Sequence, residues 1–339
     1  MNLVLAIDIG GTKLAAGIVE RSGGILARGE VPTRAADGPE AVLDRIVALG
    51  TRLLGDPAAR GVTGVGVCSP GPLDRAAGVV LSPPNLPGWD RVPLVSRLRA
   101  AFGLPVVLDN DANAAALAEF RYGAGRGACS LAYFTVSTGI GGGIVLDGKL
   151  RHGVGDAAGE FGHMTVLPDG PACPCGNRGC LETLASGTAI ARAARERLSG
   201  PAPSRLRDVP DVTAAEVARF AAAGDRVARE VWERAVRFLA QGVATVVTIL
   251  APERVVLGGG VTEAGELLFA PLREEVRRRV GLVPVEKIPI VRAALRRDVG
   301  ILGAAALCLT PSESGPDSAV PDPDAGAQPL GPEPRPPRP

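Results

Sequence analysis

One histidine and three cysteines lie close together in the sequence, in the order His163, Cys173, Cys175 and Cys180. Three thiolates and one imidazole form the tetrahedral ligand set that zinc takes in closed structural sites. The Cys-x-Cys-x₄-Cys spacing is not the commonest zinc spacing, so a redox or incidental cysteine cluster is the alternative. Two carboxylates that a four-ligand metal does not need flank the cluster, Glu160 and Glu182. A metal-fixed loop with spare carboxylates indicates a site for a polar ligand.

A glycine turn follows the first apolar segment of the chain, in the run DIGGTK from Asp8 to Lys13. The glycines Gly10 and Gly11 let backbone N–H groups approach an anion closely, and Thr12 adds a hydroxyl donor. Asp8 would repel a bare phosphate, so its presence indicates a bridging cation such as Mg²⁺. An ordinary hairpin turn is the alternative.

Two further glycine runs resemble this turn. The run STGIGGG from Ser137 to Gly143 contains Thr138, Gly139 and Gly141, and we expect it to be a turn between two strands. Because a strand and not a helix follows, a Rossmann dinucleotide site is excluded. The third run, Gly258, Gly259 and Gly260, lies between a predicted strand and a predicted helix. A flat ring or a ribose could pass close to its backbone.

Three polar residues, Asp109, Asn110 and Asp111, stand where a predicted strand meets a predicted helix. One of them is expected to cap the helix, but a cap needs only one polar side chain. A carboxylate near a helix N-terminus stays ionised. It could accept a proton from a hydroxyl group during phosphoryl transfer, which depends mainly on positioning and charge stabilisation.

Apolar periodicity predicts the elements that would position these residues. The segments 3–9, 12–19 and 25–31 indicate an antiparallel meander, and the strand–turn–strand pattern returns at 131–146, which suggests a weak internal duplication. Further strands are predicted at 62–67, 105–108 and 254–257, and helices at 39–54, from 93, 114–120, 188–198, 214–222, 225–250, 265–280 and 299–309. From residue 311 the chain is rich in proline and polar residues, which predicts disorder over 311–339.

Composition excludes several classes of protein. The 339 residues carry a mixed net charge of +1, which indicates neither a nucleic-acid surface nor a membrane surface. No apolar run is as long as a membrane span. The first residues lack a basic segment and run directly into a strand pattern, so we expect no signal peptide. Cys68, Cys129 and Cys308 lie in apolar sequence, which favours the reducing cytoplasm and free thiols.

The motifs together resemble those of the ROK family of sugar kinases and repressors, over residues 3 to 309. The runs 8–12, 137–143 and 257–260 are similar to its phosphate-1, phosphate-2 and adenosine motifs, and 110–113 is similar to its catalytic segment. The runs 159–163, 173–180 and 182–187 match the family signature in order and spacing, and this cysteine signature is highly specific.

The resemblance implies a role for each matching residue. Asp111 would be the general base on the 6-hydroxyl of a sugar, and His163 with the three cysteines would bind a structural Zn²⁺. The implied sugar-binding residues are Gly71, Asn85, Asn110, Asp111, Glu160, His163 and Glu182. ATP, accompanied by Mg²⁺, would be bound by Asp8, Gly10, Gly11, Thr12, Lys13, Thr138, Gly139, Gly141, Gly258, Gly259 and Gly260.

The implied fold is α/β: a two-lobed, actin-like (RNase H-like) ATPase fold with a central nucleotide cleft and a zinc-binding loop. We expect a small N-terminal lobe over 1–120, completed by a helix at 298–310, and a large lobe over 121–297 that contains the zinc loop. The resemblance also implies a homodimer or homotetramer.

The implied activity is ATP-dependent phosphorylation of a hexose, with glucose first and fructose or N-acetylmannosamine as alternatives. The donor, ATP or polyphosphate, is left open by the sequence. A sugar-responsive repressor is a rival. Such family members carry a helix-turn-helix domain before the kinase-like part. Because the first phosphate strand begins at Leu3 and no basic patch is found, we expect no such domain here. In an actin-like filament or chaperone ATPase, the zinc loop with its carboxylates would have no purpose.

Overall fold

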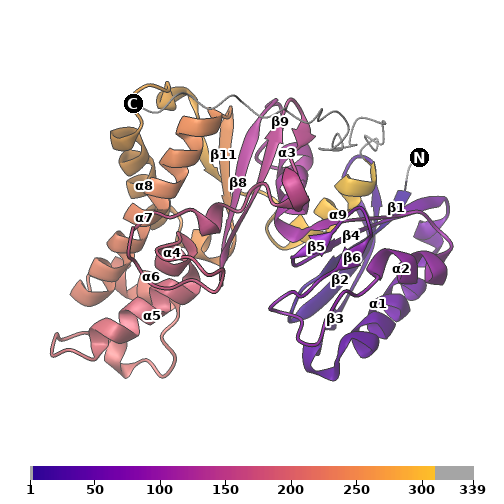
Figure 1. Ribbon diagram of the computed structural model, residues 1–339, viewed down its shortest axis with the longest axis horizontal. Helices are drawn as coiled ribbons and strands as arrows, with labels where there is room; N and C mark the ends of the chain where they lie inside the picture. Colours follow the sequence, from indigo (N-terminus) through magenta and orange to yellow (C-terminus); the bar gives the residue numbers. More distant parts are fainter. Residues whose placement is uncertain (1–2, 310–339) are drawn as a thin grey trace, which may run out of the picture. The chain divides into compact units, whose positions relative to one another are not determined.

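Two five-stranded sheets organise residues 3–309, the part of the chain that the computed structural model describes (Figure 1). Their strand orders are β3-β2-β1-β4-β7 and β10-β9-β8-β11-β12. In both sheets the first three strands are antiparallel and the last two join in parallel, so the predicted internal duplication is confirmed. A short hairpin, β5-β6, stands apart from them. The strands are β1 (Leu3–Ile9), β2 (Lys13–Glu20), β3 (Ile25–Pro32), β4 (Val62–Ser69), β5 (Leu73–Asp74), β6 (Val79–Val80), β7 (Val106–Asn110), β8 (Leu131–Val136), β9 (Ile140–Leu146), β10 (Lys149–Leu150), β11 (Arg254–Gly258) and β12 (Ile290–Arg292).

The helices lie close to the positions that periodicity predicts. They are α1 (Pro39–Leu54), α2 (Leu94–Phe102), α3 (Asp111–Tyr122), α4 (Glu182–Ala185), α5 (Gly187–Leu198), α6 (Ala214–Ala222), α7 (Arg226–Leu250), α8 (Glu266–Arg279) and α9 (Val299–Leu309). Short 3₁₀ turns that matter for the site are η3 (Val154–Asp156), η4 (Phe161–His163) and η6 (Gly260–Ala264). Within the described residues, none of these helices combines the length and apolar character needed to cross a bilayer.

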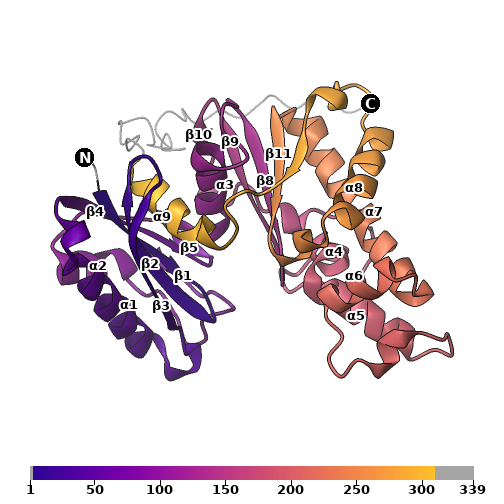
Figure 2. The ribbon, with the colours of Figure 1, turned by 180° about the vertical axis from the view of Figure 1, so that it is seen from behind.

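The first sheet is covered by helices on both faces. Alternate side chains of β1, such as Leu5 and Ile7, pack with α1 and α2, whereas Val4 and Ala6 pack with α3 and α9. Figures 1 and 2 show α1 and α2 on the outer face of this sheet and α9 on the other. Because both faces are buried, the strand is apolar at nearly every position, as expected for parallel strands of an α/β protein.

The second sheet is built in the same way. Phe134 and Val136 of β8 face a large core formed with α5, α6, α7 and α8. On the opposite face, Leu131 and Tyr133 pack against α3.

Helix α3 therefore serves both sheets. It is buried from Ala112 to Glu119. Ala114 and Leu117 belong to the cluster with the first sheet, whereas Ala115 and Ala116 belong to the cluster with the second. Small alanine side chains on all sides permit these close contacts.

The predicted lobe boundary at residue 120 falls inside α3, so the division into 1–120 and 121–297 stays a prediction. Helix α9 packs on β1, β4 and β7 of the first sheet, where the closing helix was expected. Residue 310 of that expected helix and the tail 311–339 lie outside the described residues.

Two details differ from the sequence-based expectations. Gly141 to Gly143 were expected in a turn, but β9 begins at Ile140 and includes them. Glycine is needed there for close packing, since a Cβ at 142 would overlap Phe161 and a Cβ at 143 would lie 2.6 Å from that of Ala116. In addition, Cys129 is exposed, unlike the apolar setting expected for it.

Candidate active site

Three neighbouring parallel strands place their polar ends in one row. Asp8 of β1 is in register with Cys68 of β4, and Cys68 is in register with Asp109 of β7. The Cys68 thiol lies 3.4 Å from Asp8 Oδ1. The carboxyl ends of parallel strands are the usual ligand-binding edge of such sheets, and this row places Asp8 beside the start of α3.

Asp111 is the first residue of α3, and Asn110 caps the helix by accepting a hydrogen bond from Ala112 N at 2.8 Å. The Asp111 side chain is open to solvent. The protein nevertheless surrounds it closely enough that desolvation raises its pKa to about 6, with smaller contributions from the charges of Asp8 and Glu160. A side chain that is both accessible and surrounded lies in a concave part of the surface, as a group that receives a substrate proton must.

Asp8 has a related environment. Desolvation raises the pKa of its carboxyl group, and the Cys68 thiol and Lys13 act in the opposite direction. Lys13 itself forms its ion pair with Glu30, at 3.3 Å. Among the residues that the structure describes, Asp8 is thus an oxygen donor without a close cationic partner, which is the type of ligand that Mg²⁺ takes.

The predicted first-sheet contacts to the sugar lie beside these groups. A Cβ at Gly71 would be 3.0 Å from Asn110 Nδ2, and a Cβ at Gly11 would be 2.9 Å from Asn85 Cβ. The Asn85 loop therefore packs on the Gly10–Gly11 turn, where Gly10 N donates to Lys13 O at 3.0 Å. Thr12 is exposed at the same turn.

The second sheet contributes Glu160, His163 and Glu182. Glu160 immediately precedes η4 and is exposed, and its Oε2 lies 3.8 Å from His163 Nε2. Glu182 begins α4, and its Oε2 accepts a hydrogen bond from Ile140 N at 2.8 Å. A Cβ at Gly139 would overlap this carboxylate. Glu182 therefore touches the turn that resembles the phosphate-2 motif.

The four predicted metal ligands come together. One ligand atom from each of His163, Cys173, Cys175 and Cys180 lies within 4.8 Å of the others. His163 Nδ1 is 3.6 Å from Cys173 Sγ, and Cys175 Sγ is 3.7 Å from Cys180 Sγ.

These distances fit zinc. Tetrahedral bonds of ordinary length leave about 3.8 Å between two sulfurs and about 3.6 Å between sulfur and nitrogen. Burial, together with the neighbouring thiols, raises the pKa of Cys180 to about 12. A divalent cation would offset the mutual repulsion of three thiolates, so the donor set suits such an ion. His163 would hold such an ion through Nδ1, which lies on the side of Cys173, while its Nε2 lies on the side of Glu160.

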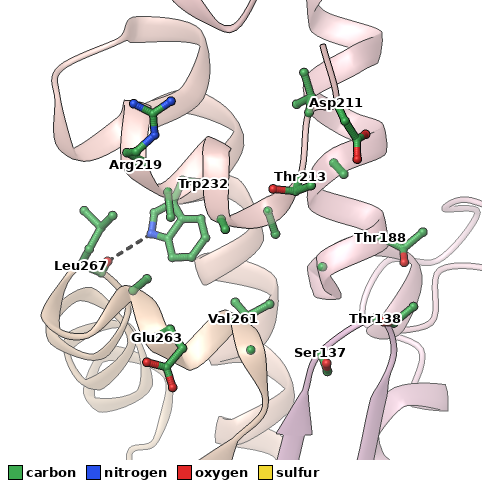
Figure 3. Close-up of a pocket in the computed structure, with 18 of the residues that line it drawn as sticks. Ser137, Thr138, Thr188, Asp211, Thr213, Arg219, Trp232, Val261, Glu263 and Leu267 are labelled. Atoms are coloured by element: carbon green, nitrogen blue, oxygen red, sulfur yellow. Dashed lines mark hydrogen bonds between the residues drawn. The ribbon is translucent and has the colours of Figure 1, made fainter. Parts of the chain in front are cut away.

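A cavity of about 690 Å³ opens next to Thr138 and Gly260 (Figure 3). It lies among α5, α6, α7 and η6, and Trp232 forms part of its wall, with Nε1 donating to Leu267 O at 3.1 Å. Its volume suits a nucleoside. Its other labelled polar and charged residues are Ser137, Thr188, Asp211, Thr213, Arg219 and Glu263.

The third glycine run lies beside this cavity, and two of its positions require glycine for steric reasons. A Cβ at Gly258 would overlap the Tyr133 hydroxyl, and one at Gly259, where φ is 87°, would overlap Val136 O. Gly260 has open space in front of it within the described part of the chain. The run therefore lets the chain turn tightly from β11 into η6 and leaves room for a ligand at its end.

Nearly the whole described chain matches the model of a known family. The model of the ROK family matches residues 4–310. The chain belongs to the ROK family. Among curated relatives, the glucokinase of Thermotoga maritima is 40% identical over 308 residues, which cover 90% of this chain and 96% of the relative. An N-acetylmannosamine kinase of Escherichia coli is 38% identical over 303 residues, covering 89% and 97%.

A solved ROK structure is similar over the same range. The ROK family glucokinase from Streptomyces griseus, in complex with glucose and AMPPNP, is 36% identical and covers 90% of this chain and 99% of its own, with a TM-score of 0.76. The expected ROK fold, two α/β halves of actin-like topology, is confirmed.

Several residues near this ROK site escaped the sequence-based reasoning. Arg75 and His152 contact Asp109 from distant parts of the chain, and Asp156 contacts Arg75. Asp211 and Trp232 line the cavity from elements that carry no motif. The rarity of histidine in the sequence was the one signal that could have drawn attention to His152.

Proposed function

We propose that this protein is an ATP-dependent hexose kinase that converts glucose to glucose 6-phosphate. The observation that supports it most is the position of Asp111. Its accessible carboxylate begins α3, next to Asp8 and the first glycine turn on one side and near Glu160 on the other. A base at this point can receive a proton from a sugar while the phosphoryl donor lies along the glycine turns.

In the proposed reaction, Asp111 accepts the proton of the sugar 6-hydroxyl. The oxygen attacks the γ-phosphorus of ATP, the bond to the β-phosphate oxygen breaks, and ADP leaves. Positioning of the hydroxyl supplies much of the rate, because phosphoryl transfer requires little covalent participation by the protein.

The hydroxyl groups of the sugar would be held by Asn110, Glu160, His163 and Glu182, with Gly71 and Asn85 in contact from the first sheet. The metal ligands, His163 and the three cysteines, would fix η4 against the loop that precedes Glu182. Zn²⁺ would hold η4 and this loop in a fixed arrangement. If Nδ1 of His163 binds the ion, Nε2 is left to contact the sugar.

The nucleotide would lie along the second sheet. The adenosine would enter the cavity beside Gly260, and the phosphates would run past Thr138 and Gly139 toward the turn at Gly10, Gly11 and Thr12. Asp8 would hold the Mg²⁺ that accompanies ATP, which neutralises the phosphate charge. Lys13, which is paired with Glu30, would have to release that exposed partner to contact a phosphate.

A coupled assay tests the proposal. The purified protein is offered glucose, fructose, mannose and N-acetylmannosamine, with ATP or polyphosphate, and with or without Mg²⁺. We expect the highest kcat/KM for glucose with MgATP. N-acetylmannosamine is the specific alternative, because the E. coli relative is an N-acetylmannosamine kinase. A preference for that sugar would contradict the assignment of glucose. Absence of turnover on every sugar would contradict the proposed kinase activity.

A further inference from the structure

The sequence contains two histidines. The one outside the predicted metal cluster, His152, also lies outside the proposed substrate contacts. It follows β10 in the segment that leads into η3, and its side chain is 22% exposed. Its Nε2 lies 2.7 Å from Oδ2 of Asp109. Because an ionised carboxylate only accepts hydrogen bonds, Nε2 carries the proton of this contact.

Asp109 connects this histidine to the start of α3. The Asp109 side chain is only 1% exposed. Its Oδ1 accepts from Asn110 N at 2.7 Å and from Asn113 Nδ2 at 3.1 Å, both in or next to the first turn of the helix. Its Oδ2 faces His152 and, at 3.3 Å, Arg75 Nε. One buried carboxylate therefore joins the catalytic end of α3 to two outside groups.

Arg75 also reaches the segment that contains His152. Its Nη1 lies 3.0 Å from Asp156 Oδ1, and its backbone N donates to Asp156 Oδ2 at 3.2 Å. Arg75 follows β5, close in sequence to Gly71. We call Arg75, Asp109, His152 and Asp156 the Asp109 cluster. Two of its contacts join the first sheet to the loop after β10 of the second sheet: Asp109 with His152, and Arg75 with Asp156.

The loop beyond His152 is short and closed. Ala158 N donates to His152 O at 2.8 Å, and Glu160 follows two residues later. The segment that bears Glu160 and His163 is thus held at one end by the Asp109 cluster and at the other by the predicted metal ligands.

We propose that His152 is a positioning residue that acts through Asp109. It fixes the segment bearing Glu160 relative to the strand end that bears Asn110 and Asp111, so that the sugar contacts from the two sheets are correctly spaced. This inference rests on the proposed hexose kinase function.

The test compares three variants of the full-length enzyme: His152→Ala, His152→Gln and Arg151→Ala. The glutamine amide can place an N–H where Nε2 lies. Arg151 is the neighbouring exposed residue, bonded to Asp147 and Leu146 O, and serves as the control. Arg75 remains beside Asp109 in every variant, so the buried carboxylate keeps a cation and the fold is preserved.

We expect His152→Ala to raise the KM for glucose about tenfold. This is less than the roughly 10²-fold that a 1 Å misplacement can cost, because Arg75 still holds Asp109. The KM for ATP and the melting temperature should stay close to those of the wild type. His152→Gln should restore most of the glucose affinity, and Arg151→Ala should behave like the wild type.

Two results would overturn the inference while leaving the kinase assignment intact. One is a glucose KM for His152→Ala equal to that of Arg151→Ala. The other is a similar rise in the KM for glucose and the KM for ATP, together with a lower melting temperature, none of which is recovered in His152→Gln. That result would indicate a structural role only. Absence of kinase activity in the wild type would instead overturn the proposed function, and this inference with it.

Discussion

At the scale of single residues, the arrangement around Asp111 depends on two properties that rarely occur together. The carboxylate is accessible, yet desolvation and the nearby charges of Asp8 and Glu160 raise its pKa to about 6. A base with a pKa just below neutral pH is ionised before the reaction and still a good proton acceptor.

Replacing the base tests this assignment directly. Asp111→Asn keeps the size of the side chain and removes its basicity, so we expect kcat to fall by about 10² to 10⁴-fold. Glucose binding, measured by calorimetry, and the melting temperature should be retained. A variant that phosphorylates glucose at nearly the wild-type rate would show that another group takes the proton.

The pH dependence follows from the same pKa. Asp111 is ionised above about pH 6, so kcat/KM for glucose should be constant near pH 7 to 8 and fall about tenfold per unit below pH 6. The residual activity of Asp111→Asn should lack this step. Because the folded-state pKa lies above the ordinary value of 3.8, the folded protein binds this proton more readily than the unfolded chain, so acidification from pH 6 to 4 favours the fold through this group.

At the scale of elements, the most informative segment is the loop between η4 and α4. It has little regular structure, and its shape depends on the convergence of His163 with the cysteines. The ligand types predict this convergence, because three thiolates and one imidazole form a ligand set that structural zinc commonly takes.

Removal of one thiol should therefore affect the sugar as well as the metal. We expect Cys175→Ser to lose bound zinc, measured by elemental analysis, and to raise the KM for glucose at least about tenfold. Cys129→Ser, at an exposed thiol outside the cluster, should keep both. A zinc-free Cys175→Ser protein with an unchanged KM would separate the metal from sugar binding.

Other features of the elements could not be predicted from local sequence. The glycines of β9 look like a turn because glycine density is high, whereas they serve to let Phe161 and α3 approach the strand. The contacts of Asp109 with Arg75 and His152 join residues far apart in the chain, and no local pattern specifies such pairs. Strand and helix positions were predictable, because apolar periodicity is a local property.

At the scale of the whole molecule, the last described helix covers one face of the first sheet. Helix α9 packs on β1 and β4, and its approach to the sheet is so close that a Cβ at Gly66 would overlap Ala304 O. The duplication of strand order could be suspected from the repeated strand–turn–strand pattern. That α3 packs against both sheets could not be predicted, because its alanine-rich sequence does not show which face contacts which sheet.

This packing gives a stability prediction. Gly66→Ala should destabilise the fold by about 1 to 3 kcal/mol, because an added methyl group in a filled core forces the backbone to shift. Urea denaturation measures the change. Gly281→Ala is the matched control, since a methyl group added there would meet no heavy atom of the described residues within 4 Å, and its effect should stay within about 0.5 kcal/mol. Equal midpoints for the two variants would show that α9 can move away from the sheet at little cost.

The hydrogen bond from Ile140 N to Glu182 has a consequence for how the two ligands of the proposed reaction are accommodated. The amide that orients this proposed sugar-binding carboxylate belongs to the turn along which phosphates would lie, so acceptor and donor share one piece of backbone. A side chain at position 139 would displace the carboxylate from this turn, because a Cβ there would overlap Glu182 Oε2. We therefore expect a substitution at this position to alter sugar and nucleotide recognition together.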